Sequence, residues 1–237
     1  MRPRVDAVLF DKDGTLFDFE ATWNVWAGQV VAALSGGDHG LAARLAAAAR
    51  YDLAAGRYFP DSPVIAGTNA EAAACLATEL PGWRVEEIEQ FLVEAAADAP
   101  LAEPVPLVPL LAELAAMDLS LGVVTNDSES VARAHLTTAG ILRVFDFIAG
   151  ADSGYGAKPA PEPLWAFARA TGHAPDRVVM VGDSTHDLRA GRAAGMWCVG
   201  VLTGLATAEA LSPFADVVLP HIGHLPAWLQ GAPVEND

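Results

Sequence analysis

Acidic residues directly follow two of the most apolar runs in the chain. The first run is followed by Asp11-Lys-Asp13-Gly-Thr, and the second by Gly-Asp183-Ser-Thr-His-Asp187. Carboxylates can attack as nucleophiles, exchange protons as general acids and bases, or bind hard divalent cations. A single Asp-x-Asp-Gly turn is more often a solvated or helix-capping turn, so the two pairs indicate a site only together with further groups.

A hydroxyl, an amide and an ammonium group follow two further apolar runs. Thr125 and Asn126 stand directly after one run, although Asn126 would also suit the N-cap of a following helix. Lys158 stands after the other, and it and Lys12 are the only two lysines among 14 basic residues. In a chain that otherwise uses arginine, an ordinary surface position is less expected for Lys158, whose compact charge suits crowded oxygens.

Four carboxylates that meet within a few ångströms repel one another strongly unless positive charge lies among them. Lys158 supplies one positive charge, and a divalent cation would supply two more. Mg²⁺ takes oxygen ligands, keeps several waters and bridges carboxylates to phosphoryl oxygens. The combined set of groups therefore indicates phosphoryl transfer with Mg²⁺.

These groups meet only if the runs before them are neighbouring strands. Outside one long interval, short apolar runs alternate with helical patterns, which favours a Rossmann-like α/β core: a parallel sheet flanked by helices, with functional groups at the carboxyl ends of the strands. The predicted strands are 5–10, 119–124, 145–149, 177–181, 196–201 and 215–219, and the predicted helices are about 106–117, 128–139, 161–171 and 185–194.

The interval from about residue 19 to 100 holds no convincing strand and is rich in Ala and Leu. Apolar residues recur in it at helical spacing, Thr68 or Asn69 suits the N-cap of a third helix, and 85–97 is predicted to be a fourth. We therefore expect a core formed by residues 1–18 and 101–237, with a small all-helical cap, residues 19–100, inserted after the first strand.

The composition excludes several classes of partner. The 237 residues include 14 Lys plus Arg and 30 Asp plus Glu, a net charge of −16 that disfavours nucleic acids and anionic lipid surfaces. The longest uncharged stretches, 21–37 and 217–234, do not resemble membrane spans, and Cys75 and Cys198 lie in apolar runs, as buried reduced thiols do. The N-terminus reaches Asp6 before any apolar run, so we expect no signal peptide and a soluble, cytoplasmic protein of undetermined oligomeric state.

The ordered set of groups closely resembles the haloacid dehalogenase-like (HAD) superfamily of phosphatases. The family pattern is Asp-x-Asp-Gly-Thr, then Ser or Thr after the second strand, then Lys, then Gly-Asp-x-x-x-Asp. This chain matches it with Asp11-Lys-Asp13-Gly-Thr, Thr125, Lys158-Pro and Gly-Asp183-Ser-Thr-His-Asp187. The helical insertion is similar to the α-helical cap of phosphoglycolate phosphatase-like members. Lys12 departs from the pattern, in which an apolar residue is commoner, and the sequence leaves its direction open.

The resemblance implies a role for each matching residue. Asp11 would be the nucleophile that forms an aspartyl-phosphate, and Asp13 would protonate the leaving alkoxide and then deprotonate the hydrolytic water. Thr125 and the amide of Asn126 would hold phosphoryl oxygens. Lys158 would offset the negative charge of Asp11 and of the phosphoryl group.

The resemblance also implies a Mg²⁺ site. Asp11, Asp183 and the backbone carbonyl of Asp13 would bind the ion, while Asp187 would orient or complete its set of ligands.

These roles would make the chain a Mg²⁺-dependent phosphatase that hydrolyses a small phosphorylated metabolite, phosphoglycolate-like or a sugar phosphate. A β-phosphoglucomutase-like phosphotransferase would use the same aspartyl-phosphate, and the sequence separates the two poorly. A non-enzymatic receiver, switched by phosphorylation of its Asp, fits less well because receivers are shorter and lack the Asp-x-Asp pair.

Substrate selection would depend on the cap. Trp23 and Trp26 would form a helix core, although one of them could line the site. For each cap arginine a solvated helix face is the commoner setting, but one that faced the site would bind a substrate carboxylate or a second phosphate. The cap arginines are Arg44, Arg50, Arg57 and Arg84.

Overall fold

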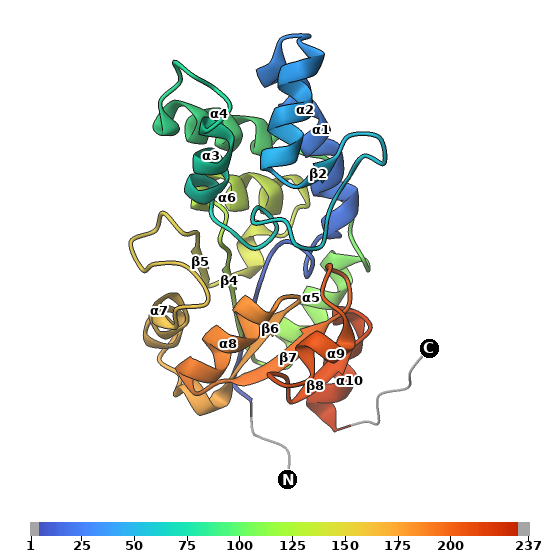
Figure 1. Ribbon diagram of the computed structural model, residues 1–237. Coiled ribbons are helices and arrows are strands. Elements are labelled where there is room, and N and C mark those ends of the chain that lie inside the picture. Colours follow the sequence, from blue (N-terminus) through green and yellow to red (C-terminus); the bar gives the residue numbers. More distant parts are fainter. Residues whose placement is uncertain (1–4, 232–237) are drawn as a thin grey trace.

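Residues 5–231 are described by a computed structural model, in which a six-stranded parallel sheet lies below a helical lobe (Figure 1). The strand order is β5-β4-β1-β6-β7-β8, and every neighbouring pair is parallel. The parallel α/β sheet expected from the sequence is thus confirmed. The strands are β1 (Ala7–Phe10), β4 (Ser120–Val124), β5 (Phe147–Ala149), β6 (Val178–Gly182), β7 (Trp197–Val201) and β8 (Val217–Leu219).

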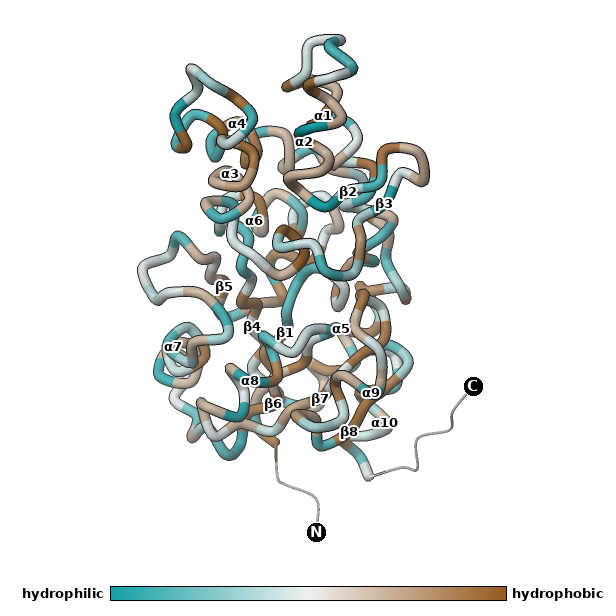
Figure 2. The backbone as a smooth tube through the Cα atoms, in the orientation of Figure 1, coloured by the Kyte–Doolittle hydropathy of each residue, from teal (hydrophilic) through white to brown (hydrophobic). Residues whose placement is uncertain are grey.

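Helices cover both faces of the sheet, because each central strand is apolar on both sides. In β1, Val8 and Phe10 pack toward one set of helices, and Ala7 and Leu9 toward the other. Apolar stretches accordingly run through the strands in Figure 2. The first face is covered by α5 (Leu107–Ala116), α6 (Glu129–Thr138) and α10 (Leu225–Gln230), the second by α7 (Glu162–Thr171), α8 (Thr185–Ala194) and α9 (Ala208–Leu211).

A helical insertion follows β1 and has a hydrophobic core of its own. The N-cap Thr68 and Glu71 form a reciprocal capping box at the start of the third helix, which fixes its first turn. Outside the insertion, short 3-10 turns lie at Leu142–Val144, Pro175–Arg177 and Ile222–His224. The insertion holds a π-helical turn (Glu20–Asn24), α1 (Val25–Ser35), α2 (His39–Ala48), α3 (Asn69–Ala77) and α4 (Val85–Ala97).

The expectation of an all-helical insertion is wrong in one detail. β2 (Tyr51–Asp52) and β3 (Arg57–Tyr58) form a short antiparallel ribbon. The turn between them is closed by the Asp52 carboxylate, which accepts hydrogen bonds from the backbone N–H groups of Ala54 and Ala55. Strands of only two residues are too short to show the alternation of apolar and polar residues by which a strand is recognised in a sequence.

The chain enters and leaves the insertion at adjacent points, since the backbone N–H of Asp18 donates to the carbonyl of Ala102 at 2.8 Å. This pairing supports the expected division into a core, 1–18 with 101–237, and a cap, 19–100, which stays our proposal. The described residues do not include 1–4 and 232–237. These residues belong to the expected core. Residues 1–4 are also part of the segment considered for a signal peptide, and 232–234 are part of the uncharged stretch 217–234.

Two smaller expectations concern membranes and thiols. Between residues 5 and 231, no helix has both the length and the apolar character needed to cross a bilayer. Both cysteines are free of disulfides; Cys198 is buried, which raises the pKa of its thiol to about 12, whereas Cys75 is only partly buried.

Phe167 tests the core on the α7 face, where it is fully buried against Gly122 of β4, Phe147 and Leu9. We expect Phe167→Ala to lower the free energy of unfolding by about 3–5 kcal/mol, because it removes a buried ring and leaves a cavity. Urea denaturation measures the change. Val108→Ala, at a helix position that is 58% exposed, is the control and should stay within about 0.5 kcal/mol of the parent; equal effects would contradict this packing.

Candidate active site

The carboxyl ends of β1, β4 and β6 bring distant segments together beneath the cap. The backbone pairing continues one residue past two of these strands: the N–H of Asp11 donates to the carbonyl of Val181 at 2.8 Å, and that of Thr125 donates to the carbonyl of Ala149 at 3.0 Å. The sheet therefore fixes the start of each polar loop before any side chain takes part.

Lys158 lies at the centre of the cluster, almost fully buried. Its Nζ is 2.5 Å from Oδ1 of Asp11 and 2.7 Å from Oδ1 of Asp187, and it donates to the carbonyl of Val124 at 2.8 Å. Burial alone would lower the pKa of Lys158, but the two carboxylates raise it above the ordinary lysine value. The ammonium group is therefore held in its charged form between two acidic groups.

Three buried carboxylates form a potential metal site. One oxygen from each of Asp11, Asp183 and Asp187 lies within 4.8 Å of the other two. Burial, and then the neighbouring carboxylates, raise the pKa of Asp11 to about 7 and raise that of Asp183 well above its ordinary value, although Lys158 opposes both shifts. One ammonium group does not balance three carboxylates, so a hard divalent cation fits this all-oxygen donor set.

The loops leave little room around the carboxylate of Asp183. A Cβ atom at Gly14, whose φ is +82°, would lie 2.4 Å from it, and one at Gly204 would lie 1.6 Å from its Oδ2. Glycine is thus required at both positions, and the two backbones confine the carboxylate to one orientation.

The N-terminus of α8 orients Asp187. The backbone N–H and the Oγ of Ser184 donate to Oδ2 of Asp187 at 3.0 and 2.7 Å, in a reciprocal capping box. Its other oxygen, Oδ1, then faces Lys158.

Thr125 and Asn126 occupy the loop after β4. The Oγ1 of buried Thr125 accepts from the backbone N–H of Asp127 at 3.1 Å. The carboxamide of Asn126 accepts from the backbone N–H of Lys158 at 2.8 Å and donates to the carbonyls of Lys158 and Ala66 at 2.8 and 2.9 Å. The Asn126 side chain therefore holds the lysine loop and a cap loop in place.

The sequence did not indicate where the side chain of Lys12 points or which residues it contacts. Lys12 is fully buried, and its Nζ lies 2.8 Å from Oδ1 of Asp13, 3.1 Å from Oδ2 of Asp127 and 3.1 Å from Nδ1 of His135. Burial alone would lower its pKa, but Asp13 and Asp127 raise it above the ordinary value. The side chain of Asp13 thus pairs with Lys12 and lies outside the three-carboxylate group.

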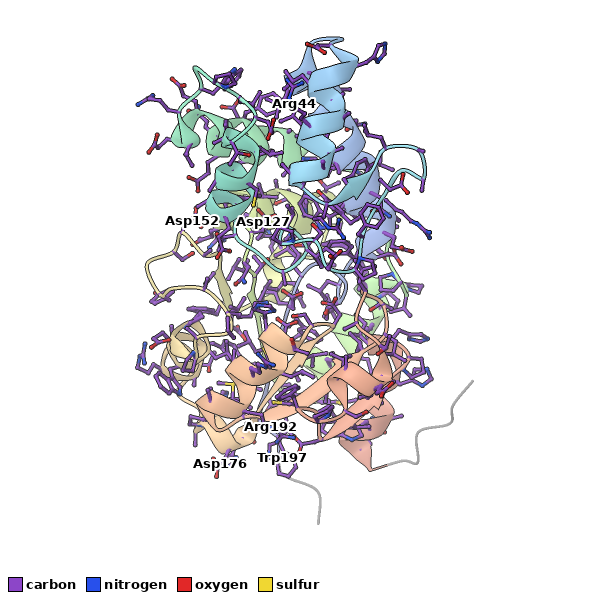
Figure 3. All side chains as sticks on the ribbon, in the orientation of Figure 1. Arg44, Asp127, Asp152, Asp176, Arg192 and Trp197 are labelled. Atoms are coloured by element: carbon purple, nitrogen blue, oxygen red, sulfur yellow. The ribbon has the colours of Figure 1, made fainter. Side chains whose placement is uncertain are left out.

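The same network reaches the cap. Asn69, at the start of α3, donates from Nδ2 to Oδ1 of Asp127 at 2.8 Å, and the Nε2 of His135 lies 2.7 Å from the carbonyl of Ala96 in α4. Figure 3 accordingly places Asp127 where the cap helices meet the sheet. The rarity of lysine in this chain drew attention to Lys12, but no spacing rule links it to a histidine 123 residues later.

A second missed segment follows β7. The hydroxyl of Thr203 donates to the carbonyl of Gly14 at 2.6 Å, and the neighbouring Gly204 packs on Asp183. Functional groups often lie in the loops that follow parallel strands. The position of this loop directly after β7 could therefore have identified it from the sequence as part of the site.

A cavity of about 80 Å³ lies between the cap and the strand ends, and the predicted site residues converge on it. From the core, it is lined by Asp11, Asp13, Thr125, Asn126, Asp127, Lys158, Asp183, Ser184, His186 and Asp187.

Known proteins resemble this chain in sequence. Phosphoglycolate phosphatase from Yersinia pseudotuberculosis serotype I (strain IP32953) is 36% identical over 116 residues, covering 48% of this chain and 50% of that protein. The chain thus spans about half the length of the curated relatives that it matches first. Validoxylamine A 7'-phosphate phosphatase from Streptomyces hygroscopicus subsp. limoneus is 32% identical over 179 residues, covering 70% of this chain and 83% of that protein.

The fold has counterparts among solved structures. CbbY from Rhodobacter sphaeroides, crystallised in complex with phosphate, is 21% identical and superposes with a TM-score of 0.70, covering 93% of this chain and 96% of that one. At this identity the likeness concerns the fold. The family model for haloacid dehalogenase-like hydrolases matches residues 5–195. With this match over most of its length, the chain belongs to the haloacid dehalogenase-like hydrolase family.

Proposed function

We propose that the protein is a Mg²⁺-dependent phosphatase that hydrolyses a small phosphorylated metabolite through an aspartyl-phosphate. The observation that carries this proposal is the buried cluster in which Lys158 binds Asp11 and Asp187 while Asp183 completes a three-carboxylate group. Relatives named as phosphatases of phosphoglycolate and of validoxylamine A 7'-phosphate support phosphate-ester hydrolysis.

Asp11 is the nucleophile in this proposal. Because Lys158 binds its Oδ1, we assign the attack on phosphorus to Oδ2. The new oxygen–phosphorus bond forms as the bond from phosphorus to the leaving oxygen breaks. The positive charge of Lys158 favours the ionised form of Asp11 and offsets the charge that builds on the phosphoryl oxygens.

Asp13 is the general acid and then the general base. Its Oδ1 accepts from Lys12, so Oδ2 remains to give a proton to the leaving oxygen. It then takes a proton from the water that attacks the aspartyl-phosphate, and this step releases phosphate and regenerates Asp11.

The loop after β4 holds the phosphoryl group. We assign the hydroxyl of Thr125 and the backbone N–H of Asn126 as donors, since the Asn126 carboxamide already binds Lys158 and Ala66. Asp11, Asp183 and Asp187 would hold Mg²⁺, with the backbone carbonyl of Asp13 as a further ligand. When bound, the ion would neutralise these carboxylates and the phosphoryl oxygens.

The cap determines what reaches this cluster. It closes over the cavity through Asn69 and Ala66, which contact the loop after β4. Such a closed site admits a small metabolite and excludes a folded macromolecule. Nucleic acid is a poor partner for a chain with a net charge of −16.

Asp11→Asn tests the nucleophile. The amide cannot form an aspartyl-phosphate, so we expect phosphate release from 4-nitrophenyl phosphate with Mg²⁺ to fall by at least about 10³-fold. Circular dichroism checks folding, and Asp152→Asn, a substitution outside the cluster, is the control. Unchanged turnover in Asp11→Asn would overturn the mechanism.

Protons and Mg²⁺ compete for the carboxylates of the cluster. Since the pKa of Asp11 is about 7, this group is protonated below pH 7 and must release its proton when the ion binds. Because burial also raises the pKa of Asp183, a second ligand of the ion, we expect the Kd for Mg²⁺ to rise by at least about tenfold for each pH unit below 7. Calorimetry from pH 5.5 to 8.5 measures the Kd; values independent of pH would contradict the assignment.

Lys12→Met tests the orientation of Asp13. Loss of the ammonium group frees the Asp13 carboxylate, so proton donation should suffer most when the leaving group is poor. We expect kcat to fall by about tenfold more for an alkyl phosphate than for 4-nitrophenyl phosphate. Arg133→Met, which removes an exposed ion pair with Glu129, is the control. An equal loss of kcat with both esters would contradict this role and would mean that Lys12 only stabilises the structure.

A further inference from the structure

Most side chains on the cap side of the cavity are apolar or aromatic. Its lining brings together ring-bearing side chains from three segments of the insertion and aliphatic side chains from α3 and the loop before it, while the polar Thr68 and Asn69 lie at the start of α3. The ring-bearing and aliphatic residues include Phe19, Trp23, Trp26, Tyr58, Val64, Ile65 and Ala72.

The apolar surface continues deeper into the cap. A second cavity, of about 20 Å³, lies among apolar and aromatic residues of the cap core and shares four lining residues with the first. The shared residues are Trp26, Tyr58, Val64 and Ala72. The region that receives the leaving group therefore offers ring surfaces suited to a flat or ring-shaped group.

The cap arginines do not supply a cation to this region. Arg44 pairs with Glu79 at 3.1 Å and lies on the outer part of the cap in Figure 3. The others behave alike: Arg50 pairs with Asp61, Arg84 pairs with Glu87, and Arg57 is exposed. Within the described chain, none of the four lines the cavity, so the alternative that one of them binds a substrate carboxylate loses its support.

Acidic groups dominate the charge around the same cavity. Among its described lining residues, Lys158 is the only lysine or arginine, and it is already bound to Asp11 and Asp187. Asp13 and Asp127 also line the cavity, with Lys12 buried between them. A second anion on the substrate, beyond the phosphoryl group, would enter this acidic surrounding without a partner.

We propose that this site selects phosphate esters whose leaving alcohol is uncharged and ring-shaped, and that it discriminates against esters carrying a carboxylate or a second phosphate. The inference rests on the proposed phosphatase function and narrows its substrate class. The phosphoryl group binds at the strand ends, and the ring of the leaving group packs against the aromatic side chains of the cap. A sugar ring and an aromatic ring share this chemistry.

Pairs of phosphate esters that differ only by a carboxylate or a carboxamide test the effect of substrate charge at nearly constant shape. The charge pair is 2-phosphoglycolate and its amide, and a second pair is 4-carboxyphenyl phosphate and 4-carbamoylphenyl phosphate. With the wild-type chain and Mg²⁺, we expect kcat/KM to be at least about tenfold higher for the amide of each pair. Equal values, or a preference for the carboxylates, would overturn the inference while leaving the phosphatase function intact.

Three primary-alcohol esters test the ring. Ethyl phosphate, benzyl phosphate and a hexose 6-phosphate differ in the group packed against the cap. We expect both ring-bearing esters to exceed ethyl phosphate by about tenfold in kcat/KM, and the larger of the two values identifies the kind of ring. Equal rates for all three esters would overturn the ring requirement. Absence of hydrolysis with every ester would instead overturn the proposed function, and this inference with it.

Two substitutions test the electrostatic origin. Ile65→Arg places a cation on the cap side of the cavity and should reduce the preference for the amide by at least about fivefold, whereas the neutral control Ile65→Gln should retain it. His186→Gln removes the remaining lining side chain that can carry positive charge. If His186→Gln selectively abolished hydrolysis of the carboxylate esters, the site would have a cation for them and the proposal would be wrong.

Discussion

The structure depends on the compensation of charge around one buried ammonium group. Lys158 lies between Asp11 and Asp187, with Asp183 beside them and almost no exposure to water. Without that positive charge, three carboxylates in a poorly solvated space would take up protons, and Asp11 would then be a poor nucleophile for the proposed reaction. The raised pKa values of Asp11 and Asp183 show that one ammonium group leaves the balance incomplete.

Most of the surrounding architecture holds these charges in position. The sheet sets the start of each loop, the capping box of α8 orients Asp187, and glycines on two separate loops confine Asp183. Lys12 compensates negative charge in the same way in a second cluster. Its buried ammonium group contacts Asp13, Asp127 and the ring of His135. Asp13, the proposed general acid, is thus linked to the cap residues Asn69 and Ala96 by a single polar network.

The strands and their polar ends could be predicted because apolar runs and the groups that follow them are local in sequence. The convergence of Asp11, Lys158 and Asp183 then follows from the geometry of a parallel sheet. The contacts of Lys12 could not be predicted, since they depend on how α6 and the loop after β4 pack against the loop after β1. The cap lining is equally hidden: helical spacing shows that Trp23 and Trp26 share a face, but it does not show what that face contacts.

One helix belongs to both halves of the molecule. Val131 of α6 packs in the hydrophobic core of the cap, whereas Ala132 and Leu136 pack in the core of the sheet. The cap therefore cannot lift away as a detached lid without exposing Val131 and the apolar cap surface packed against it. A movement of the cap that keeps both hydrophobic cores packed is therefore limited to a small sliding across α6, of the kind called shear.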